Sequence, residues 1–503
     1  MMETADSIIR CYFFYFMSQI KNISKKLLTN PAIVYIASRY ATYVIQVINS
    51  LFIAVYLGPF YLGIWGFVQL IIQYIAQINL GIPHAVNVIV SIEKKNEDYV
   101  RKVIGNGVVM LLFLSLLVVL FFTANYFLNF NIGTKYNFQH YIIPVSIIGI
   151  LGYYNSLFAN IFRIYGKIMA IALNQSLFPV LMLLTIIFFK NEGLLWALVF
   201  VNLLSVLIAF FVFIIQRPVS FKPFYDWKIA QIIQKKGWHL FMYNASFYLI
   251  MLSTKSFISG YYSVKEFGFF TFSYSLAQAM LLFFEAISYL IFPKLINRFA
   301  NSDNSHTSKI LETARNVYIT SAHALVHVVI LIFPVFLYFF PKYETTFSVF
   351  ALTVLTVTLY SNTFGYAGLL QARGKEKTLG KISLIALILN IVFVFLLILG
   401  LRVTYEYVII ATMLSYFLFV IILGIYGRKN LSLSISFRSI FEYVFPLRIA
   451  LPFIISVMLI VFKGNYVLFL FPLLLFIILN YKNIFQIKSI IKQVVNNSNL
   501  INI

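Results

Sequence analysis

Amide and charged side chains inside long apolar stretches are the residues of this chain best placed to do chemistry. The stretch from Leu57 to Gln77 has no charged residue, but it carries Gln69, Gln73 and Gln77 at intervals of four. Helical periodicity places these three amides on one face. Such a face meets either another helix, through hydrogen bonds of about 1 kcal/mol each, or a hydrated cavity. The sequence leaves both alternatives open.

Three charged residues also lie within apolar stretches, namely Arg39, Lys255 and Glu285. A charge in the middle of a membrane costs about 2.5–3.5 kcal/mol even on insertion scales, so it normally faces protein or water. Arg39 and Lys255 have the alternative of extending to the nearer membrane surface. Two cations against one acid favour an anionic substrate, for which a diphosphate is the natural candidate. Glu285 is a candidate for ion coupling or for a structural partner of a base.

Residue patterns of known enzyme chemistry are missing. The acidic residues of the predicted outer loops stand one to a loop, so none forms the carboxylate pair of acid/base hydrolysis: Glu192, Glu266, Glu344 and Glu406. The six histidines include no HExxH, and the glycine spacing of "GLLQARGK" does not fit a phosphate loop. His323 and His327 are four residues apart, a spacing for which packing is favoured over metal binding or proton relay. We therefore expect no catalytic residue, metal or cofactor.

The elements that carry these residues are membrane-spanning helices. The 503 residues are 61% hydrophobic and only 11% charged, and uncharged windows near the 20 residues of a membrane span recur along the chain. The sequence predicts an all-α polytopic membrane protein of about 14 transmembrane helices. The predicted spans are 32–57, 61–92, 103–124, 141–162, 168–189, 193–215, 238–262, 267–292, 316–340, 346–370, 379–400, 405–427, 446–462 and 465–481.

The positive charge of the chain predicts its orientation rather than a nucleic-acid partner. Thirty of the 38 Lys and Arg residues fall in the termini and in one alternating set of loops, and six fall in the opposite loops. By the positive-inside rule, both termini are cytoplasmic. "CYFFYFM" near the N-terminus resembles a signal sequence without a cleavage site, so we expect an uncleaved cytoplasmic segment, the alternative being a natural start at Met17.

Two segment pairs indicate an internal repeat. Gly63 and Gly268 align at an offset of 205, which also aligns Gln73 with Gln278, and "GK" at 166–167 matches 374–375 at an offset of 208. Six spans intervene, so the two halves have the same orientation, as in carriers that rock two bundles about a central site. The predicted organisation is 1–30 cytoplasmic segment, 31–216 first lobe, 217–237 linker, 238–427 second lobe, 428–481 an extra helix pair, and 482–503 cytoplasmic tail.

The repeat makes spans one, two, seven and eight equivalent pairs, and we predict that they line a cleft between the lobes. The predicted cavity residues are Arg39, Gln46, Asn49, Gln69, Gln73, Gln77, Asn244, Lys255 and Gln278, with Glu285 as the ion-coupling candidate. Tyr248 and Tyr274 lie near the same faces.

The chain resembles a known family in "LGPFYLGIWGFVQL", "VKEFGFF", "RIYGK" and "QARGKEK" and in its fourteen short-looped spans. It is similar to the polysaccharide transport branch of the MOP flippase superfamily, and in particular to Wzx-type O-antigen flippases. The resemblance implies a carrier of the bacterial inner membrane, with a V-shaped pair of six-helix lobes and a cationic cavity. Its implied cargo is an undecaprenyl-diphosphate-linked oligosaccharide.

The resemblance also implies protein partners, a polysaccharide polymerase and a chain-length regulator, around what we expect to be a monomer. On this basis Arg39 and Lys255 attract the diphosphate or acidic sugars, and the amides and tyrosines contact sugar hydroxyls. The alternatives are a MATE-like drug exporter, a lipid II flippase and, among enzymes, an O-antigen polymerase. The last should have a large periplasmic loop, and all predicted loops are short.

Overall fold

The computed structural model describes residues 31–128, 130 and 132–496, apart from the side chains of 31–37, 239–240, 281, 283–294, 297 and 486–496. Within these residues every regular element is helical, and the predicted all-α polytopic fold is confirmed. The predicted N-terminal segment, 1–30, lies outside the described residues. The predicted tail begins inside the last helix, which continues to Asn496.

The helices fall into three consecutive groups. The first lobe comprises α2 (Pro31–Gln77), α3 (Ile82–Ile92), α4 (Glu97–Leu128), η1 (Thr134–Tyr136), η2 (Phe138–Tyr141), α5 (Ile142–Ile164), α6 (Ile168–Phe188) and α7 (Asn191–Ile215). The second lobe comprises α8 (Trp227–Tyr261), α9 (Val264–Asn301), α10 (Asn304–Phe339), η3 (Pro341–Thr346), α11 (Phe347–Ser361), α12 (Tyr366–Ala372), α13 (Glu376–Phe395), η4 (Leu396–Gly400) and α14 (Ile409–Asn430). The extra group comprises α15 (Phe437–Ser439), η5 (Ile440–Val444), α16 (Leu447–Val461), η6 (Tyr466–Phe469) and α17 (Leu470–Asn496).

Each predicted span overlaps a helix, part of a helix or a helix pair. By length and composition, ten helices of the described chain can cross a membrane, or eleven if the bent pair Phe437–Val444 and Leu447–Val461 counts as one span. One of the ten, Ser38–Gln77, contains most of the first predicted span and half of the second. The number of helices that meet this test is therefore smaller than the fourteen predicted spans.

Glycine and proline cause the breaks within the spans. Inside α2, Gly58 has a φ of 68° and Pro59 follows it, so the helix kinks there. Gly81 (φ 75°) separates α2 from α3, and Gly365 (φ 84°) separates α11 from α12. Glycine adopts this left-handed backbone without a steric penalty, and proline removes a helical N–H donor. The α2–α3 and α11–α12 spans are thus discontinuous helices.

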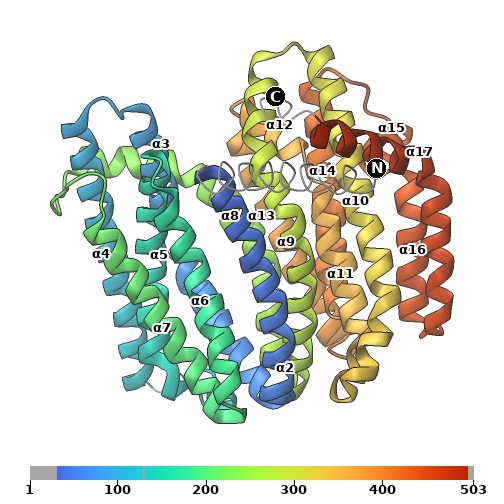
Figure 1. Cartoon of the computed structure of the whole chain (residues 1–503), viewed down its shortest axis with the longest axis horizontal. Helices are drawn as coiled ribbons and strands as arrows, with labels where there is room; N and C mark the ends of the chain where they lie inside the picture. Colours follow the sequence, from blue (N-terminus) through green and yellow to red (C-terminus); the bar gives the residue numbers. More distant parts are fainter. Residues whose placement is uncertain (1–30, 129, 131, 497–503) are drawn as a thin grey trace, which may run out of the picture.

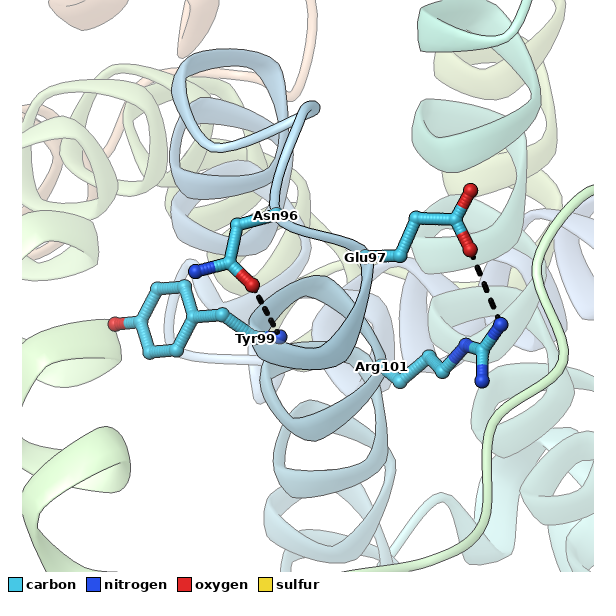
Figure 2. A network of polar contacts seen from close by, with 4 residues as sticks. All are labelled: Asn96, Glu97, Tyr99 and Arg101. Atoms are coloured by element: carbon cyan, nitrogen blue, oxygen red, sulfur yellow. Dashed lines mark hydrogen bonds and ion pairs between the residues drawn. The ribbon is translucent and has the colours of Figure 1, made fainter.

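One end of the bundle carries the basic turns that the sequence predicts to be cytoplasmic, and we call it the basic end. Its α3–α4 turn is shown in Figure 2, where the Asn96 side chain accepts a hydrogen bond from the Tyr99 N–H (3.2 Å) and thereby caps α4. Glu97 and Arg101 form an exposed i,i+4 ion pair at 3.1 Å in the same turn. Such a pair adds little stability, so capping is the main determinant of where α4 begins.

The two lobes meet at the opposite end, which we call the far end. There α2 and α9 lie side by side (Figure 1). A Cβ on Gly63 would overlap the carbonyl of Val264, and a Cβ on Gly268 would overlap the carbonyl of Pro59. Only glycine permits this approach of the two backbones. The two glycines aligned by the repeat therefore both lie in the lobe contact.

Polar contacts close the far end from both lobes. In the first lobe, Lys135 donates to the carbonyls of Gly260 (3.0 Å) and Tyr262 (2.7 Å), and the Tyr136 hydroxyl donates to the carbonyl of Ser259 (2.8 Å). In the second lobe, the Tyr343 hydroxyl donates to the carbonyl of Ala54 (2.6 Å). Each lobe thus donates hydrogen bonds to carbonyl groups of the other, and separating the lobes at this end breaks all of these bonds.

Helix α8 contacts both lobes. It begins at Trp227, inside the predicted linker 217–237, and Asp226 caps it by accepting from the Ile229 N–H (3.1 Å). The Asp226 carbonyl also accepts a hydrogen bond from Asn106 of α4 (2.8 Å), so the start of α8 is attached to the first lobe. Its later half packs against α13 of the second lobe. This course carries Asn244 and Lys255 across the boundary between the lobes.

Candidate functional site

Lys255 lies at the contact of the two lobes. Its side chain is only 8% exposed, and its ammonium group is 3.5 Å from the Gln73 side-chain oxygen of α2. On the other side the ammonium lies over the Tyr274 ring of α9, 3.5 Å from the ring centroid, in a cation–π contact. No carboxylate pairs with Lys255 among the described side chains. The protein thus holds a cation between the lobes with only an amide and an aromatic face as partners.

The neighbours of Lys255 in the chain explain its orientation. Thr254 bonds to Thr412 of α14 (2.7 Å), and Asn390 of α13 donates to Ser253 (2.9 Å) and Thr254 (3.0 Å). These bonds turn that face of α8 towards the interior of the second lobe. Because successive helical residues point about 100° apart, Lys255 is directed away from it, towards α2.

The glutamines of α2 lie near the same boundary. Gln73 contacts Lys255, as described above, and Gln77 lines a cavity between the lobes. The Gln69 side chain is half-buried, and its amide nitrogen has no hydrogen-bond partner in the described part of the chain. The adjacent Tyr74 hydroxyl is 2.7 Å from the Ser256 hydroxyl of α8. The amide face of α2 therefore lies along α8, and one of its members lines a cavity.

Two cavities lie beside this boundary. One, of about 290 Å³, is lined from both lobes by polar side chains that include Gln77, Asn79, His84 and Asn244. The other, of about 400 Å³, is lined by the second lobe, with Gln278 and Tyr274 among its residues. Both cavities include Tyr248 in their lining, and we call them the polar cavity and the aromatic cavity. The Lys255 ammonium lies over the ring of Tyr274, a residue that lines the aromatic cavity.

Three predicted cavity residues, Arg39, Gln46 and Asn49, lie earlier on α2 than the glutamines at this boundary. The Asn49 amide donates to the Pro179 carbonyl of α6 (2.8 Å) and is buried inside the first lobe, where it joins two helices. Arg39 is half-buried and donates to the Tyr43 hydroxyl of its own helix (2.7 Å). Gln46 is half-buried on the same helix, one turn before Ser50. For Asn49 the structure shows interhelical hydrogen bonding, the first of the two alternatives for an amide.

The ion-coupling candidate, Glu285, lies on α9, but its side chain lies outside the described residues.

The histidine pair of α10 takes part in packing. His323 is buried with Nε2 3.3 Å from the Asn362 amide, and His327 is buried with Nδ1 3.3 Å from the Ser456 hydroxyl of α16. Among the described residues, no group of three or more potential metal ligands occurs. These contacts connect α10 to the discontinuous α11–α12 span and to α16 of the extra group. They are packing contacts, the role that the sequence favours for this pair.

Sequence reasoning did not identify the aromatic residues that dominate the larger cavity. They come from four separate segments and are Tyr243, Phe247, Tyr318, Tyr360, Phe364 and Tyr416. Tyrosines in the middle of apolar spans were a usable signal. Phenylalanine gives no such signal, because 54 of them occur throughout the chain.

The fold matches solved structures, although no protein-family model and no curated protein matches the sequence. Lipid II flippase MurJ in an inward closed conformation gives a TM-score of 0.63 at 14% identity, covering 92% of this chain and 100% of that one. An inward-facing multidrug resistance MATE family transporter of the MOP superfamily gives 0.60 at 14% identity, covering 79% and 98%. An outward-facing multidrug resistance MATE family transporter of the MOP superfamily gives 0.57 at 13% identity, covering 79% and 94%. The chain has the MATE and MurJ fold. The protein is a polytopic membrane protein of the architecture shared by MOP-superfamily transporters.

Proposed function

We propose that this protein is a flippase that moves an undecaprenyl-diphosphate-linked oligosaccharide, an O-antigen or capsule repeat unit, across the bacterial inner membrane by alternating access. The observation that carries the proposal is the buried ammonium of Lys255 between the lobes, without a carboxylate partner among the described side chains. A desolvated cation is costly unless an anion or strong acceptors compensate it. A diphosphate supplies that compensation when the cargo binds.

Lobe movement changes the surroundings of Lys255. Its amide partner, Gln73, belongs to the first lobe, whereas Lys255 and Tyr274 belong to the second. When the lobes move apart, the contact at 3.5 Å is lost and the ammonium turns to the central passage. The same displacement that opens the passage thus exposes the cation to an anionic head group.

The arrangement in the membrane follows from the distribution of charge. We propose that the basic end faces the cytoplasm, that both termini are cytoplasmic, and that the far end faces the periplasm. The closed far end then corresponds to a state that is closed towards the periplasm. An ion gradient drives the cycle in this proposal, with Glu285 as the coupling residue. The protein acts as a monomer beside a polysaccharide polymerase and a chain-length regulator.

A MATE-like small-molecule exporter is the second candidate, and the aromatic cavity favours it. Aromatic walls are typical of sites for organic cations. Here, however, two cations adjoin residues of the lining: the Lys255 ammonium lies over the Tyr274 ring, and the Arg315 guanidinium donates to the Phe364 carbonyl (2.7 Å). Both repel an organic cation. A lipid II flippase shares the preference for a diphosphate and differs from the leading proposal only in the glycan.

A transport assay on purified protein tests the proposal. The protein is reconstituted in liposomes with a fluorescent undecaprenyl-diphosphate oligosaccharide, and dithionite quenching measures its movement between leaflets. We expect Lys255→Gln to slow transport at least tenfold and Lys255→Arg to retain part of it. Lys102→Gln removes an exposed lysine at the start of α4 and serves as the matched control.

Two results would count against the proposal. Transport of the lipid-linked probe at the wild-type rate by Lys255→Gln would remove the role of the ammonium. Failure of the wild-type protein to move the probe, together with export of an organic cation such as ethidium, would establish the second candidate instead.

A further inference from the structure

The aromatic cavity differs in chemistry from the polar cavity beside it, and this difference suggests a second binding function. Among the side chains that the structure describes, the lining of the aromatic cavity includes no charged residue, whereas five of its lining residues are tyrosines other than the shared Tyr248: Tyr243, Tyr274, Tyr318, Tyr360 and Tyr416. Each tyrosine combines an aromatic face with a hydroxyl group. The cavity therefore offers apolar faces and hydrogen-bonding edges together.

The rings form two groups within the lining, which we call walls. In one wall Phe247 of α8 packs against Tyr360 of α11 (ring centroids 4.2 Å apart) and stacks against Tyr416 of α14 (5.3 Å). In the other wall Tyr318 of α10 stacks against Phe364, at the break between α11 and α12 (4.1 Å). The members of each wall come from different helices. Stacking across helices fixes the rings before any ligand binds.

The broken helix that contributes to both walls is also held rigidly. Arg315 of α10 is 2% exposed and donates to the carbonyls of Asn362 (2.6 Å) and Phe364 (2.7 Å). The same guanidinium donates to the Val444 carbonyl of η5 (3.1 Å). It therefore satisfies carbonyl groups that the break removes from helical bonding. Preorganised walls favour binding because less conformational entropy is lost.

Three classes of ligand group can be compared with this lining. A polyprenyl chain would cover the Gln278 side-chain amide in the lining without offering it a hydrogen bond, which is unfavourable. An organic cation would be repelled by the Lys255 ammonium, which lies over the ring of the lining residue Tyr274. A pyranose ring has an apolar face of C–H groups and a rim of hydroxyls, and so matches both features of the walls. About 400 Å³ lies within the usual 300–1,000 Å³ of ligand sites and suits one substituted ring.

We propose that the aromatic cavity binds one pyranose ring of the carried oligosaccharide, in contact with the rings of the Phe247 and Tyr318 walls, and that it thereby determines which glycan is transported. This inference rests on the proposed function. A diphosphate bound to the Lys255 ammonium would lie close to the cavity, because Lys255 contacts the lining residue Tyr274. Glycan selectivity then resides in the second lobe, whereas recognition of the diphosphate involves both lobes.

Binding to the purified full-length protein in nanodiscs tests the inference. The probes are farnesyl diphosphate and farnesyl diphosphate carrying glucose, galactose or N-acetylglucosamine, and calorimetry measures each Kd. We expect at least one sugar to strengthen wild-type binding by about tenfold, near the upper range of one aromatic contact. Phe247→Leu should remove most of that gain and leave the Kd of farnesyl diphosphate unchanged.

Two control variants separate stacking from a loss of folding. Phe257→Leu alters the same helix at a ring that packs on Phe395 (4.7 Å) and does not line the cavity, so it should keep the full sugar-dependent gain. Tyr318→Phe keeps the ring of the second wall and removes one hydroxyl, so it should keep most of the gain.

The outcomes distinguish this inference from the proposed function. If the wild-type protein binds farnesyl diphosphate but no attached sugar strengthens binding, the inference is overturned and the proposed function stands. If Phe247→Leu weakens binding of sugar-free and sugar-bearing probes equally, the inference is also overturned. If the protein binds none of the diphosphates, the proposed function fails first.

Discussion

Replacing Gly268 by alanine should open the far end of the molecule. A Cβ at Gly268 would lie 2.8 Å from the carbonyl carbon of Pro59 and 3.0 Å from the Gly63 nitrogen, whereas ordinary contacts lie at 3.4–4 Å. The obstructing atoms belong to the backbone of α2, so no side chain can turn aside, and α2 and α9 have to separate. The overlap exists only while the lobes are in contact at this end.

The expected magnitude follows from the cost of overpacking, which is about 1–3 kcal/mol for an added carbon in a well-packed contact. If that cost falls only on the closed state, the ratio of closed to open molecules falls about 5-fold to 150-fold. Gly63→Ala should act in the same direction, because its Cβ would overlap the Val264 carbonyl. We expect a rise in the population that is open at the far end.

Double electron–electron resonance can measure this shift. Cys11, the single cysteine, is replaced by serine, and spin labels are attached at Lys190→Cys in the first lobe and Lys342→Cys in the second, both exposed. In Gly268→Ala the distance distribution should gain a longer component. Gly193→Ala is the matched control, since a Cβ there would approach nothing closer than 3.9 Å.

The reasoning would be refuted if Gly268→Ala and Gly193→Ala gave the same distance distribution in folded protein. It would be refuted equally if the closed component increased. Either result would mean that the glycine contact does not limit how closely the lobes pack.

Three further predictions concern the fold. Arg315→Gln should lower the free energy of unfolding by about 3–5 kcal/mol, because it leaves the buried carbonyls of Asn362 and Phe364 without their donor. Denaturant titration of the purified protein measures this free energy, and a decrease of less than about 1 kcal/mol would contradict the prediction. Lys135→Met should open the far end in the same resonance assay, though less than Gly268→Ala, because it removes two hydrogen bonds and creates no overlap; an unchanged distance distribution would disprove this. Burial raises the pKa of Glu406, in the loop before α14, so the folded state binds its proton more tightly than the unfolded state; the resulting stability is present below the ordinary carboxyl pKa and is lost as pH rises through the raised value. Glu406→Gln should accordingly raise Tm at pH 8 and leave it nearly unchanged at pH 4, and a gain confined to pH 4 would reverse the sign of the argument.

The helical elements could be predicted from the sequence because a bilayer imposes a simple rule. Backbone groups in hydrocarbon must be hydrogen-bonded within the segment, so long apolar runs form helices. The repeat of Gly63 and Gly268 was also readable, since close backbone approach requires the same residue in both halves. The kink at Gly58 falls between the first two predicted spans. The breaks at Gly81 and Gly365 fall inside the predicted spans 61–92 and 346–370, each of which hydropathy alone counted as one helix.

The site was only partly predictable. Gln73, Gln77, Asn244, Lys255 and Gln278 were selected because polar groups in apolar helices stand out, and the structure brings them to the lobe boundary or its cavities. The rings of the aromatic cavity did not stand out, because aromatic residues make up 18% of the chain and most serve packing.

By itself, the sequence determined that the protein is a polytopic helical membrane protein with a polar and basic subset of residues inside its spans, since burial in lipid depends on composition along one chain segment. Only the tertiary structure decided which of those residues lie close to one another. Asn49 faces α6 and Lys255 faces Gln73 and Tyr274, because the direction of a side chain depends on how separate helices rotate and pack against one another. That rotation is set by contacts between residues far apart in the chain, such as those of α2 with α9, and no local pattern records them.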